Sequence, residues 1–274
     1  MSLRQLGTAV YKYLNYEALP PSASDISTEL KVGVKAIQAV IDKLREAEAS
    51  IAKMENDEGT LSGDVEMDEH AIRTFHISAK NKHYQHLIPD DLKEAGHKYF
   101  LVHMRVIGMR KRGGRKLYLK LLPYRPVAPG SRPPPLTNEE LLESKLLDQL
   151  TPGTKVISAV VYTDGAQAYQ SVIAEHYPGL ISKTVSHSDM EFTRKLKWFK
   201  KGHSTVAGTQ CIDSTWGALD QFINDHVKTK ADHQVNERLL TYIWSGLCRM
   251  NHREDDGLSR VGAAMKNNMN SNTE

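Results

Sequence analysis

Two aspartates lie where strands are predicted to end, and they are the residues of this sequence best placed to do chemistry. Asp164 follows the strand-like "VVYT", and helical spacing begins just after Gly165. Asp68 lies in "GDVEMDEH", whose alternation predicts a strand with Val65 and Met67 on one face and acidic residues on the other. Ligands bind outside strand ends in open α/β sheets because loops converge there. If the two strands are neighbours, the two carboxylates are placed to share a ligand.

A divalent cation is the simplest ligand for such a pair. Two carboxylates close together repel each other, and a bound cation offsets that repulsion. Mg²⁺ prefers oxygen ligands and needs only one or two carboxylates beside waters and a substrate phosphate. For Asp164 alone, the better interpretation is a turn residue, since Asp-Gly is a frequent strand terminator. The metal hypothesis therefore depends on the two residues meeting.

Composition limits the classes of protein that could carry these residues. The 274 residues suffice for one large domain or two smaller ones. The sequence has no bilayer-length apolar run and no signal-peptide layout at its start, so we expect an intracellular protein without a membrane partner. Cys211 and Cys248 cannot build a four-ligand zinc site, and we expect both thiols to be buried. The net charge of +3 is only mildly basic, so an argument for nucleic acid depends on where the charges lie.

Residues 1–55 predict a small helical region with a helix-turn-helix pattern. Residues 22–48 hold two amphipathic helices separated by a break at Gly33, and "LRQLGTAVYKYL" can supply a third. The second helix of such a pair can enter a major groove, which makes Lys35 a candidate DNA contact. A bundle that only packs is the alternative, and the pattern alone slightly favours it.

Residues 63–253 predict a mixed α/β domain. The segment 97–126 contains two strand-like runs around a Gly-Gly turn, which predicts three successive antiparallel strands when the strand holding Asp68 is counted. A proline-rich connection at 124–136 leads to a capping box, Thr137 with Glu140, at the start of a helix. The strand before Asp164, a helix, a short strand and two amphipathic helices follow, and we expect the last two to pack onto the sheet. The polar tail 254–274 is expected to be loose.

Five segments occur in an informative order. They are "VEMDEH" (65–70), "VVYTDGAQAY" (160–169), "VSHSDMEF" (185–192), "GTQCIDSTWGALDQF" (208–222) and "YIWSGLCRMNHR" (242–253). Together they resemble the blocks of the ISXO-like insertion-sequence transposases, a DDE-type recombinase family. The resemblance covers roughly residues 63–253. It implies an α/β fold, an RNase H-like mixed sheet flanked by helices, preceded here by the helix-turn-helix region.

The resemblance also implies a catalytic site. Asp68 matches the first catalytic acid of the family, Asp164 the second, and Asp213 stands in for the usual third, a Glu. These residues would hold two Mg²⁺ ions, or Mn²⁺, for in-line attack on a phosphodiester. Water as nucleophile gives DNA cleavage, and a DNA 3′-hydroxyl gives strand transfer. The implied partners are transposon ends and target DNA, and a homo-oligomer is compatible with them.

Two departures from the family favour an alternative function. Asp213 has an arm one methylene shorter than Glu, and a misplacement of about 1 Å can cost on the order of 10²-fold in rate. Asp220 replaces a Lys of the family about two helical turns further on. The alternative is therefore a domesticated or catalytically inactive DNA-binding protein that retains the fold. A protein-binding scaffold is a third hypothesis. Cytoplasm is the expected compartment for a bacterial source and the nucleus for a eukaryotic one.

Basic segments supply the remaining candidate DNA contacts. One is the Gly-Gly turn "RKRGGRK", for which a solvated hairpin tip is the ordinary interpretation, and another is "RKLKWFKKGH", where aromatic residues could stack on bases. Two histidines near the resemblance blocks join them. The candidates beside Lys35 are Arg110, Lys111, Arg112, Arg115, Lys116, His187, Arg194, Lys195, Lys197, Trp198, Lys200, Lys201 and His203.

Overall fold

The structure is a computed structural model, and it describes most of the chain. The described residues are 1–15, 20–82, 84–150, 159–184, 194–197, 204–226, 237–253, 257–259 and 261–262. They divide into two compact units. The helical unit contains residues 1–58 and the described residues from Leu219 onward. The sheet unit contains the described residues between Gly59 and Ala218.

The helical unit begins with three helices, as the sequence predicts. They are α1 (Leu3–Leu14), α2 (Ala23–Leu30) and α3 (Val34–Glu58). Ser2 and Ser22 begin the first two with capping boxes, and α2 ends at Lys31, which adopts the left-handed conformation. Their apolar faces share one core. The helix α3 runs well beyond the segment over which the sequence pattern predicts it.

The last long helix, α8 (Glu237–Asn251), packs against α3 within this unit. A buried ion pair joins the two, because Arg249 contacts Glu48 at 3.0 Å and Ser245 donates to the same carboxylate at 2.7 Å. A charge removed from water is stable only when paired in this way. The expectation that α8 packs onto the sheet was therefore wrong, since hydrophobic periodicity shows that a helix is buried but does not identify what covers it.

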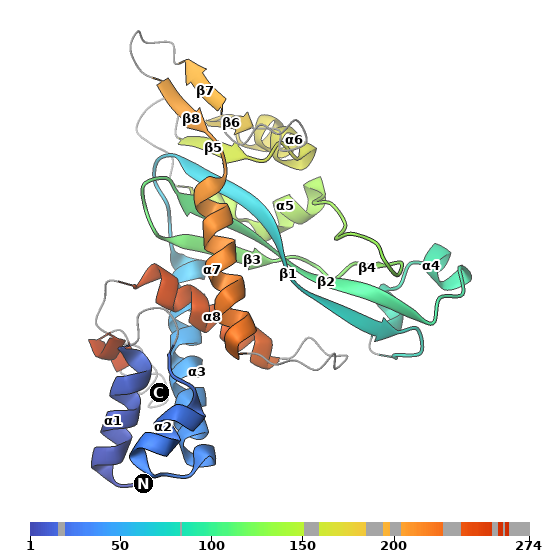
Figure 1. Cartoon of the computed structure of the whole chain (residues 1–274). Helices are drawn as coiled ribbons and strands as arrows, with labels where there is room; N and C mark the ends of the chain where they lie inside the picture. The colour runs from blue at the N-terminus through green and yellow to red at the C-terminus, as the bar shows by residue number, and fades with distance from the viewer. Residues whose placement is uncertain are drawn as a thin grey trace, which may run out of the picture. The chain divides into compact units, whose positions relative to one another are not determined.

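The sheet unit is built on one mixed sheet with the strand order β3-β2-β1-β5-β6 (Figure 1). The strands are β1 (Val65–Ser78), β2 (Tyr99–Lys111), β3 (Leu117–Leu121), β5 (Ala159–Thr163) and β6 (Leu180–Thr184). A short strand, β4 (Pro126–Val127), pairs with β2. The first three strands are antiparallel, as predicted, and β5 and β6 run parallel to β1. This arrangement is the RNase H-like mixed sheet that the sequence led us to expect.

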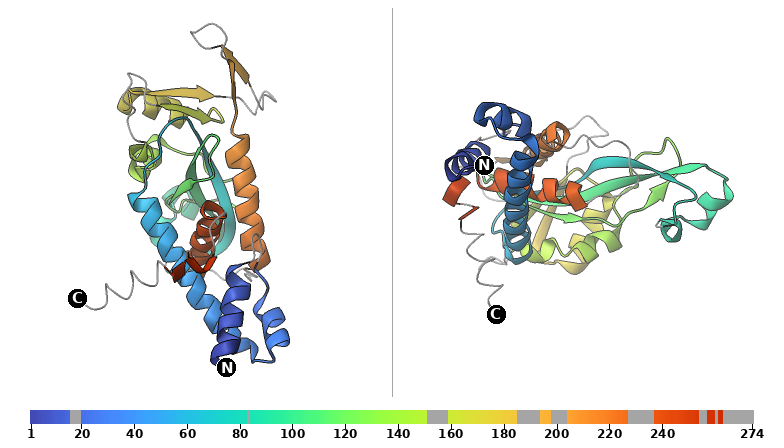
Figure 2. Two further views of the ribbon diagram at one scale, coloured as in Figure 1. Left: turned by 90° about the vertical axis from the view of Figure 1, so that its left-hand side faces the viewer. Right: turned by 90° about the horizontal axis from the view of Figure 1, so that it is seen from below.

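Helices cover both faces of this sheet (Figure 2). The helices α5 (Asn138–Ser144) and α6 (Gln167–His176) share a core with Val65 and Met67 on one face. The predicted capping box of Thr137 and Glu140 begins α5. The first half of α7 (Gln210–His226) contacts Glu66 and Asp68 on the other face. The alternation read from the sequence is thus confirmed.

Strand β1 is longer than expected. It continues to Ser78 beside β2 as a two-stranded ribbon, and η1 (Gln85–Leu87) and α4 (Asp90–Glu94) lie in the connection between them (Figure 1). Asp68 is therefore the fourth residue of β1 rather than a residue near its end. The error arose because the alternation becomes irregular at the β-bulge between Ala71 and Arg73.

Some features were not predicted. A hairpin of β7 (Arg194–Lys197) and β8 (Ser204–Ala207) lies in a segment read only as basic. Cys248 is buried as expected, but Cys211 is exposed, because it lies at the first turn of α7. The expected strand before Asp164 is described only from Ala159, and most of the tail lies outside the described residues. Among the described residues, no helix combines the length and the apolar character that a membrane span requires.

Candidate active site

Asp68 and Asp164 are brought together by the register of two neighbouring strands. In the parallel pair of β1 and β5, Val65 faces Val161 and Glu66 faces Tyr162. That register offset is 96 residues, the separation of Asp164 from Asp68, and Asp64 accepts a hydrogen bond from Val160 across the same offset. Residues level with each other on parallel strands point to the same face. The two aspartates therefore continue the pairing at the point where β5 ends.

Asp164 also begins the next element. Its Oδ1 accepts a hydrogen bond from the Ala166 N–H at 3.1 Å, and Gly165 supplies the positive φ of 94° that the turn requires. The helix α6 starts one residue later. The turn function is thus real, and it fixes the aspartate at the edge of the sheet because the backbone on both sides of it is held.

The third acid, Asp213, lies in the first turn of α7, and Glu66 holds that turn against the sheet. The buried Glu66 carboxylate accepts hydrogen bonds from the Cys211 and Ile212 N–H groups at 2.8 and 3.0 Å. An anion at a helix N-terminus is stabilised by the free N–H groups and the helix dipole. Thr209 donates to the Asp213 carboxylate at 3.1 Å. The acidic face of β1 therefore anchors the helix that carries the third acid.

Two arginines of the "RKRGGRK" segment complete this anchor. Arg112 pairs with Glu66 at 3.2 Å and lies over the Tyr162 ring at 4.1 Å. Arg110 donates to the Cys211 carbonyl at 2.6 Å and to the Thr215 hydroxyl. Both were candidate DNA contacts, and in the structure both guanidinium groups are engaged with α7 or with the carboxylate that holds it.

The three acids are close enough to perturb one another. Burial raises the pKa of Asp68 to about 7, and the charges of Asp164 and Asp213 raise it further, against the effect of a hydrogen bond from Trp216. An ordinary Asp carboxyl titrates near 4, so the ionised form is strongly disfavoured here. The sheet unit thus holds an acidic cluster, which we define as Asp68, Asp164 and Asp213.

Tyr169 lies beside this cluster from the first turn of α6. Its side chain is only 1% exposed, and its hydroxyl has no hydrogen-bond partner among the described residues. Burial holds the pKa of Tyr169 well above its usual value, and the nearby carboxylates, Asp68 foremost, add to the effect. A buried hydroxyl without a partner costs free energy, so the group has an unused hydrogen bond to offer.

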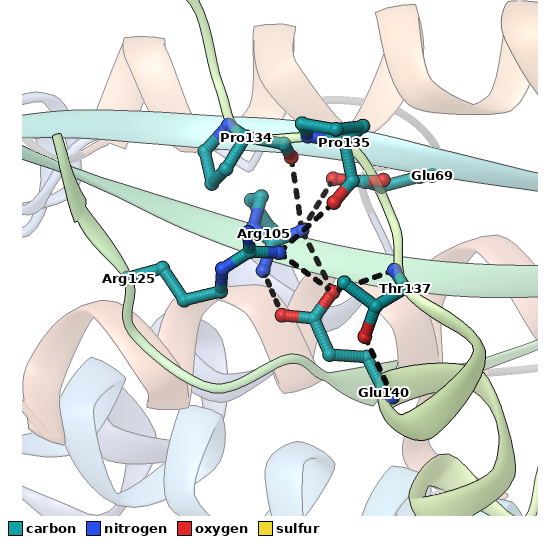
Figure 3. Close-up of polar contacts among 7 residues, drawn as sticks. All are labelled: Glu69, Arg105, Arg125, Pro134, Pro135, Thr137 and Glu140. Atoms are coloured by element: carbon teal, nitrogen blue, oxygen red, sulfur yellow. Dashed lines mark hydrogen bonds and ion pairs between the residues drawn. The ribbon is translucent and has the colours of Figure 1, made fainter.

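A buried arginine supports the other side of β1 (Figure 3). Arg105 on β2 is fully buried and contacts Glu69 at 3.1 Å, Glu140 of α5 and the Pro134 carbonyl at 3.1 Å. Arg125 donates to the Pro135 carbonyl and to Glu140. Burial raises the pKa of Glu69 against the opposing effect of Arg105. These contacts bind the proline-rich connection to the strand that carries Asp68.

The donor atoms of the acidic cluster fit a hard divalent cation. All are carboxylate oxygens, which suit Mg²⁺ and Mn²⁺ rather than softer metals. The raised pKa of Asp68 shows that negative charge is already crowded there, as a cation site requires. Within the described part of the chain, no three His, Cys, Asp or Glu side chains are grouped tightly enough to hold a metal ion. The carboxylates are near one another without being gathered around a single point.

The structure places the other predicted DNA contacts in three groups. Lys35 is exposed in the first turn of α3, and Lys111, Arg115 and Lys116 are exposed at the β2–β3 turn. Arg194, Lys195 and Lys197 lie on β7, of which the structure describes the backbone. The rest lie outside the described residues, and they are His187, Trp198, Lys200, Lys201 and His203.

Sequence reasoning missed several residues of the site. Trp216 and Tyr169 lie within the resemblance blocks, but no role was assigned to either. Arg105 carried a signal that could have been used, because a lone charge in the apolar run "FLVHMRVIGM" implies a buried ion pair. Glu69 gave no such signal, since a Glu beside an Asp in a half-buried strand is ordinary.

Comparisons with known proteins add little to these contacts. No protein-family model matches the sequence, and no curated protein matches it. Among solved structures, the chain is similar to the crystal structure of a pre-cleavage Mos1 transpososome, with 10% identity, a TM-score of 0.26, and coverage of 89% of this chain and 74% of that chain. It is also similar to the Mos1 strand transfer complex, with the same identity and coverage and a TM-score of 0.23. Neither likeness is strong enough to carry an argument, so the fold assignment depends on the strand order and the site on the contacts above.

Proposed function

We propose that the sheet unit is the catalytic domain of a transposase or transposase-derived protein, which cleaves and joins DNA with the help of a divalent metal. The observation that carries this proposal is the acidic cluster. Asp68, Asp164 and Asp213 come from β1, the end of β5 and the first turn of α7, and the last two raise the pKa of the first. An RNase H-like sheet supplies the frame, and the segments named above resemble DDE transposases in the same order.

The acidic cluster would hold Mg²⁺ or Mn²⁺. Such ions, when bound, make water a stronger nucleophile and stabilise the attacking and leaving oxygens of a phosphodiester. Asp68 would bind as an anion, although burial and its neighbours oppose its ionisation. Glu66 keeps the first turn of α7 in place through its two backbone hydrogen bonds. Asp213 is exposed there, so its carboxylate is accessible to a metal ion and to DNA.

The first test measures metal binding, because it requires no knowledge of the DNA sequence that the protein cleaves. Mn²⁺ bound to the purified chain would be counted by electron paramagnetic resonance. We expect Asp68→Asn and Asp164→Asn each to weaken Mn²⁺ binding at least 10-fold. Asp91→Asn, which changes an exposed aspartate of α4, is the matched control and should bind as the wild type does. Unchanged affinity in both site variants would refute the assigned site.

The second test measures DNA cleavage. Nicking of supercoiled plasmid in Mg²⁺ or Mn²⁺ should be abolished by Asp164→Asn and retained by Asp91→Asn. Nicking that survives in Asp164→Asn would exclude this site as its source. If the wild-type chain binds DNA and Mn²⁺ but neither nicks nor joins DNA, the catalytic proposal fails and the non-catalytic DNA-binding alternative is supported.

A further inference from the structure

The sheet has a gap directly opposite Asp68, and one side chain fills it. In the antiparallel pair of β1 and β2, Asp68 faces Gly108. A Cβ placed on Gly108 would lie 2.4 Å from Cη2 and 2.6 Å from Cζ2 of Trp216, which no real packing allows. The indole of Trp216 therefore lies against the backbone of β2 at this position. Only glycine leaves room for it there.

The same indole is oriented by two further contacts. Its Nε1–H donates to Asp68 Oδ2 at 3.0 Å. Its ring stacks on His70, the next residue of that face of β1, with centroids 5.3 Å apart and planes 8° from parallel. The side chain of Trp216 is only 3% exposed. An aromatic ring held on both sides in this way has little freedom to turn.

We propose that Trp216 is a positioning residue for the metal-binding carboxylate of Asp68, and that Gly108 is required for this role. The inference rests on the proposed function. The indole N–H uses one acceptor site of Oδ2, and the Glu69 N–H also donates to the carboxyl group. Because a carboxylate has about four acceptor sites, these two bonds fix its plane and leave sites for a cation. Asp68 thus reaches the metal in one orientation.

Trp216 links the first acid to the third. It lies on α7 one turn beyond Asp213, and Ile212, beside that acid, is anchored to Glu66 of β1. A shift of α7 along the sheet would break the indole hydrogen bond to Asp68 and move Asp213 at the same time. Partners that orient a metal ligand in this way typically change metal affinity or activity 10–100-fold when they are removed.

The experiment compares two substitutions with a matched control for each. Trp216→Phe keeps an aromatic ring but removes the N–H, and its control is Trp244→Phe in α8 of the helical unit. Gly108→Ala pushes the indole away, and its control is Gly217→Ala, where an added Cβ meets nothing within 4 Å. We expect Trp216→Phe and Gly108→Ala to weaken Mn²⁺ binding roughly 10–100-fold. Both controls should bind Mn²⁺ as the wild type does.

A spectroscopic readout separates positioning from simple packing. In protein labelled with 5-fluorotryptophan, the ¹⁹F resonance that Trp216→Phe removes belongs to Trp216. We expect this resonance to move when Mn²⁺ is replaced by diamagnetic Mg²⁺ at saturation, to move with Mg²⁺ against metal-free protein, and to stay fixed on adding Mg²⁺ to Asp68→Asn. A resonance that ignores Mg²⁺ in the wild type would overturn the role.

The outcomes distinguish this inference from the proposed function. Normal Mn²⁺ affinity in folded Trp216→Phe, together with weak affinity in Asp164→Asn, would overturn the role of Trp216 and leave the metal site intact. Absence of Mn²⁺ binding by the wild-type chain would overturn the proposed function, and the role of Trp216 with it. If Gly108→Ala fails to fold, the Trp216→Phe comparison decides the matter alone.

Discussion

Replacing Asp68 by Asn should stabilise the metal-free protein at neutral and alkaline pH. The folded state holds Asp68 with a pKa of about 7, whereas the unfolded chain should titrate near the ordinary value of 3.8. Between these two values the folded state binds a proton that the unfolded state has lost. Stability therefore falls as pH rises from about 4 to about 7, and it stays low above that range. Asn, which carries no charge, escapes this loss.

The size of the effect follows from the shift in pKa. A shift of about 3 pH units corresponds to roughly 4 kcal/mol, since each unit is about 1.4 kcal/mol. The carboxylate relaxes and water enters in part, so we expect Asp68→Asn to raise the free energy of unfolding by about 1–4 kcal/mol at pH 8. At pH 4, where the aspartate is protonated in the fold, the gain should be small. Asn can still accept the Trp216 N–H bond through its own oxygen.

Urea denaturation in EDTA at pH 4 and pH 8, followed by circular dichroism, measures this effect. Asp91→Asn in α4 is the control, and an exposed substitution of this kind should change stability by less than about 0.5 kcal/mol at either pH. Adding Mg²⁺ at pH 8 should stabilise the wild type and not Asp68→Asn, which reverses their order. If Asp68→Asn is no more stable than the wild type at pH 8 without metal, the crowding of charge inferred for the acidic cluster is wrong.

Three further predictions concern other parts of the chain. Glu48→Ala leaves Arg249 buried without its partner, so it should lower the free energy of unfolding by about 3–5 kcal/mol in urea titrations, whereas Glu46→Ala, in an exposed pair with Lys43, should cost at most about 1 kcal/mol. Tyr169→Phe removes a buried hydroxyl that lacks a partner among the described residues, so the metal-free protein should be equally stable or about 1 kcal/mol more stable, and a clear loss would show that the hydroxyl is bonded after all. Changing the exposed cations of the β2–β3 turn to Gln should weaken DNA binding for every sequence and lower the slope of log K against log salt by about 0.9 for each phosphate that the turn no longer neutralises. Binding that keeps its salt slope would exclude this turn, whose exposed cations are Lys111, Arg115 and Lys116.

Local patterns predicted the parts of the fold that local chemistry controls. The alternation around Asp68 gave the correct faces of β1, because side chains of a strand alternate whatever lies beside it. The capping box at Thr137 and the Asp-Gly end of β5 were found for the same reason, since each is satisfied within a few residues of chain. The meeting of Asp68 with Asp164 was expected only if their strands were neighbours. The strand register supplies that condition.

Features set by distant partners were missed. The pattern of α8 shows one apolar face but cannot identify α3 as the surface that covers it. Trp216 was assigned no role because its hydrogen bond to Asp68 and its place over Gly108 exist only after α7 has packed on the sheet. Arg110 and Arg112 look like free surface charges in the sequence, yet their long side chains reach α7 and Glu66.

The helical unit is assembled from both ends of the described chain, and this has a consequence for biosynthesis. Glu48 leaves the ribosome early, but Arg249 and Ser245, which neutralise and bond it, are translated only after the entire sheet unit. A nascent chain must therefore keep the buried surface of α3 out of harm for most of its synthesis, in a form that chaperones or water can tolerate. A frameshift or stop codon before residue 245 would yield a fragment in which the sheet unit could fold but the first three helices could not close, and such fragments are natural targets for cellular proteases.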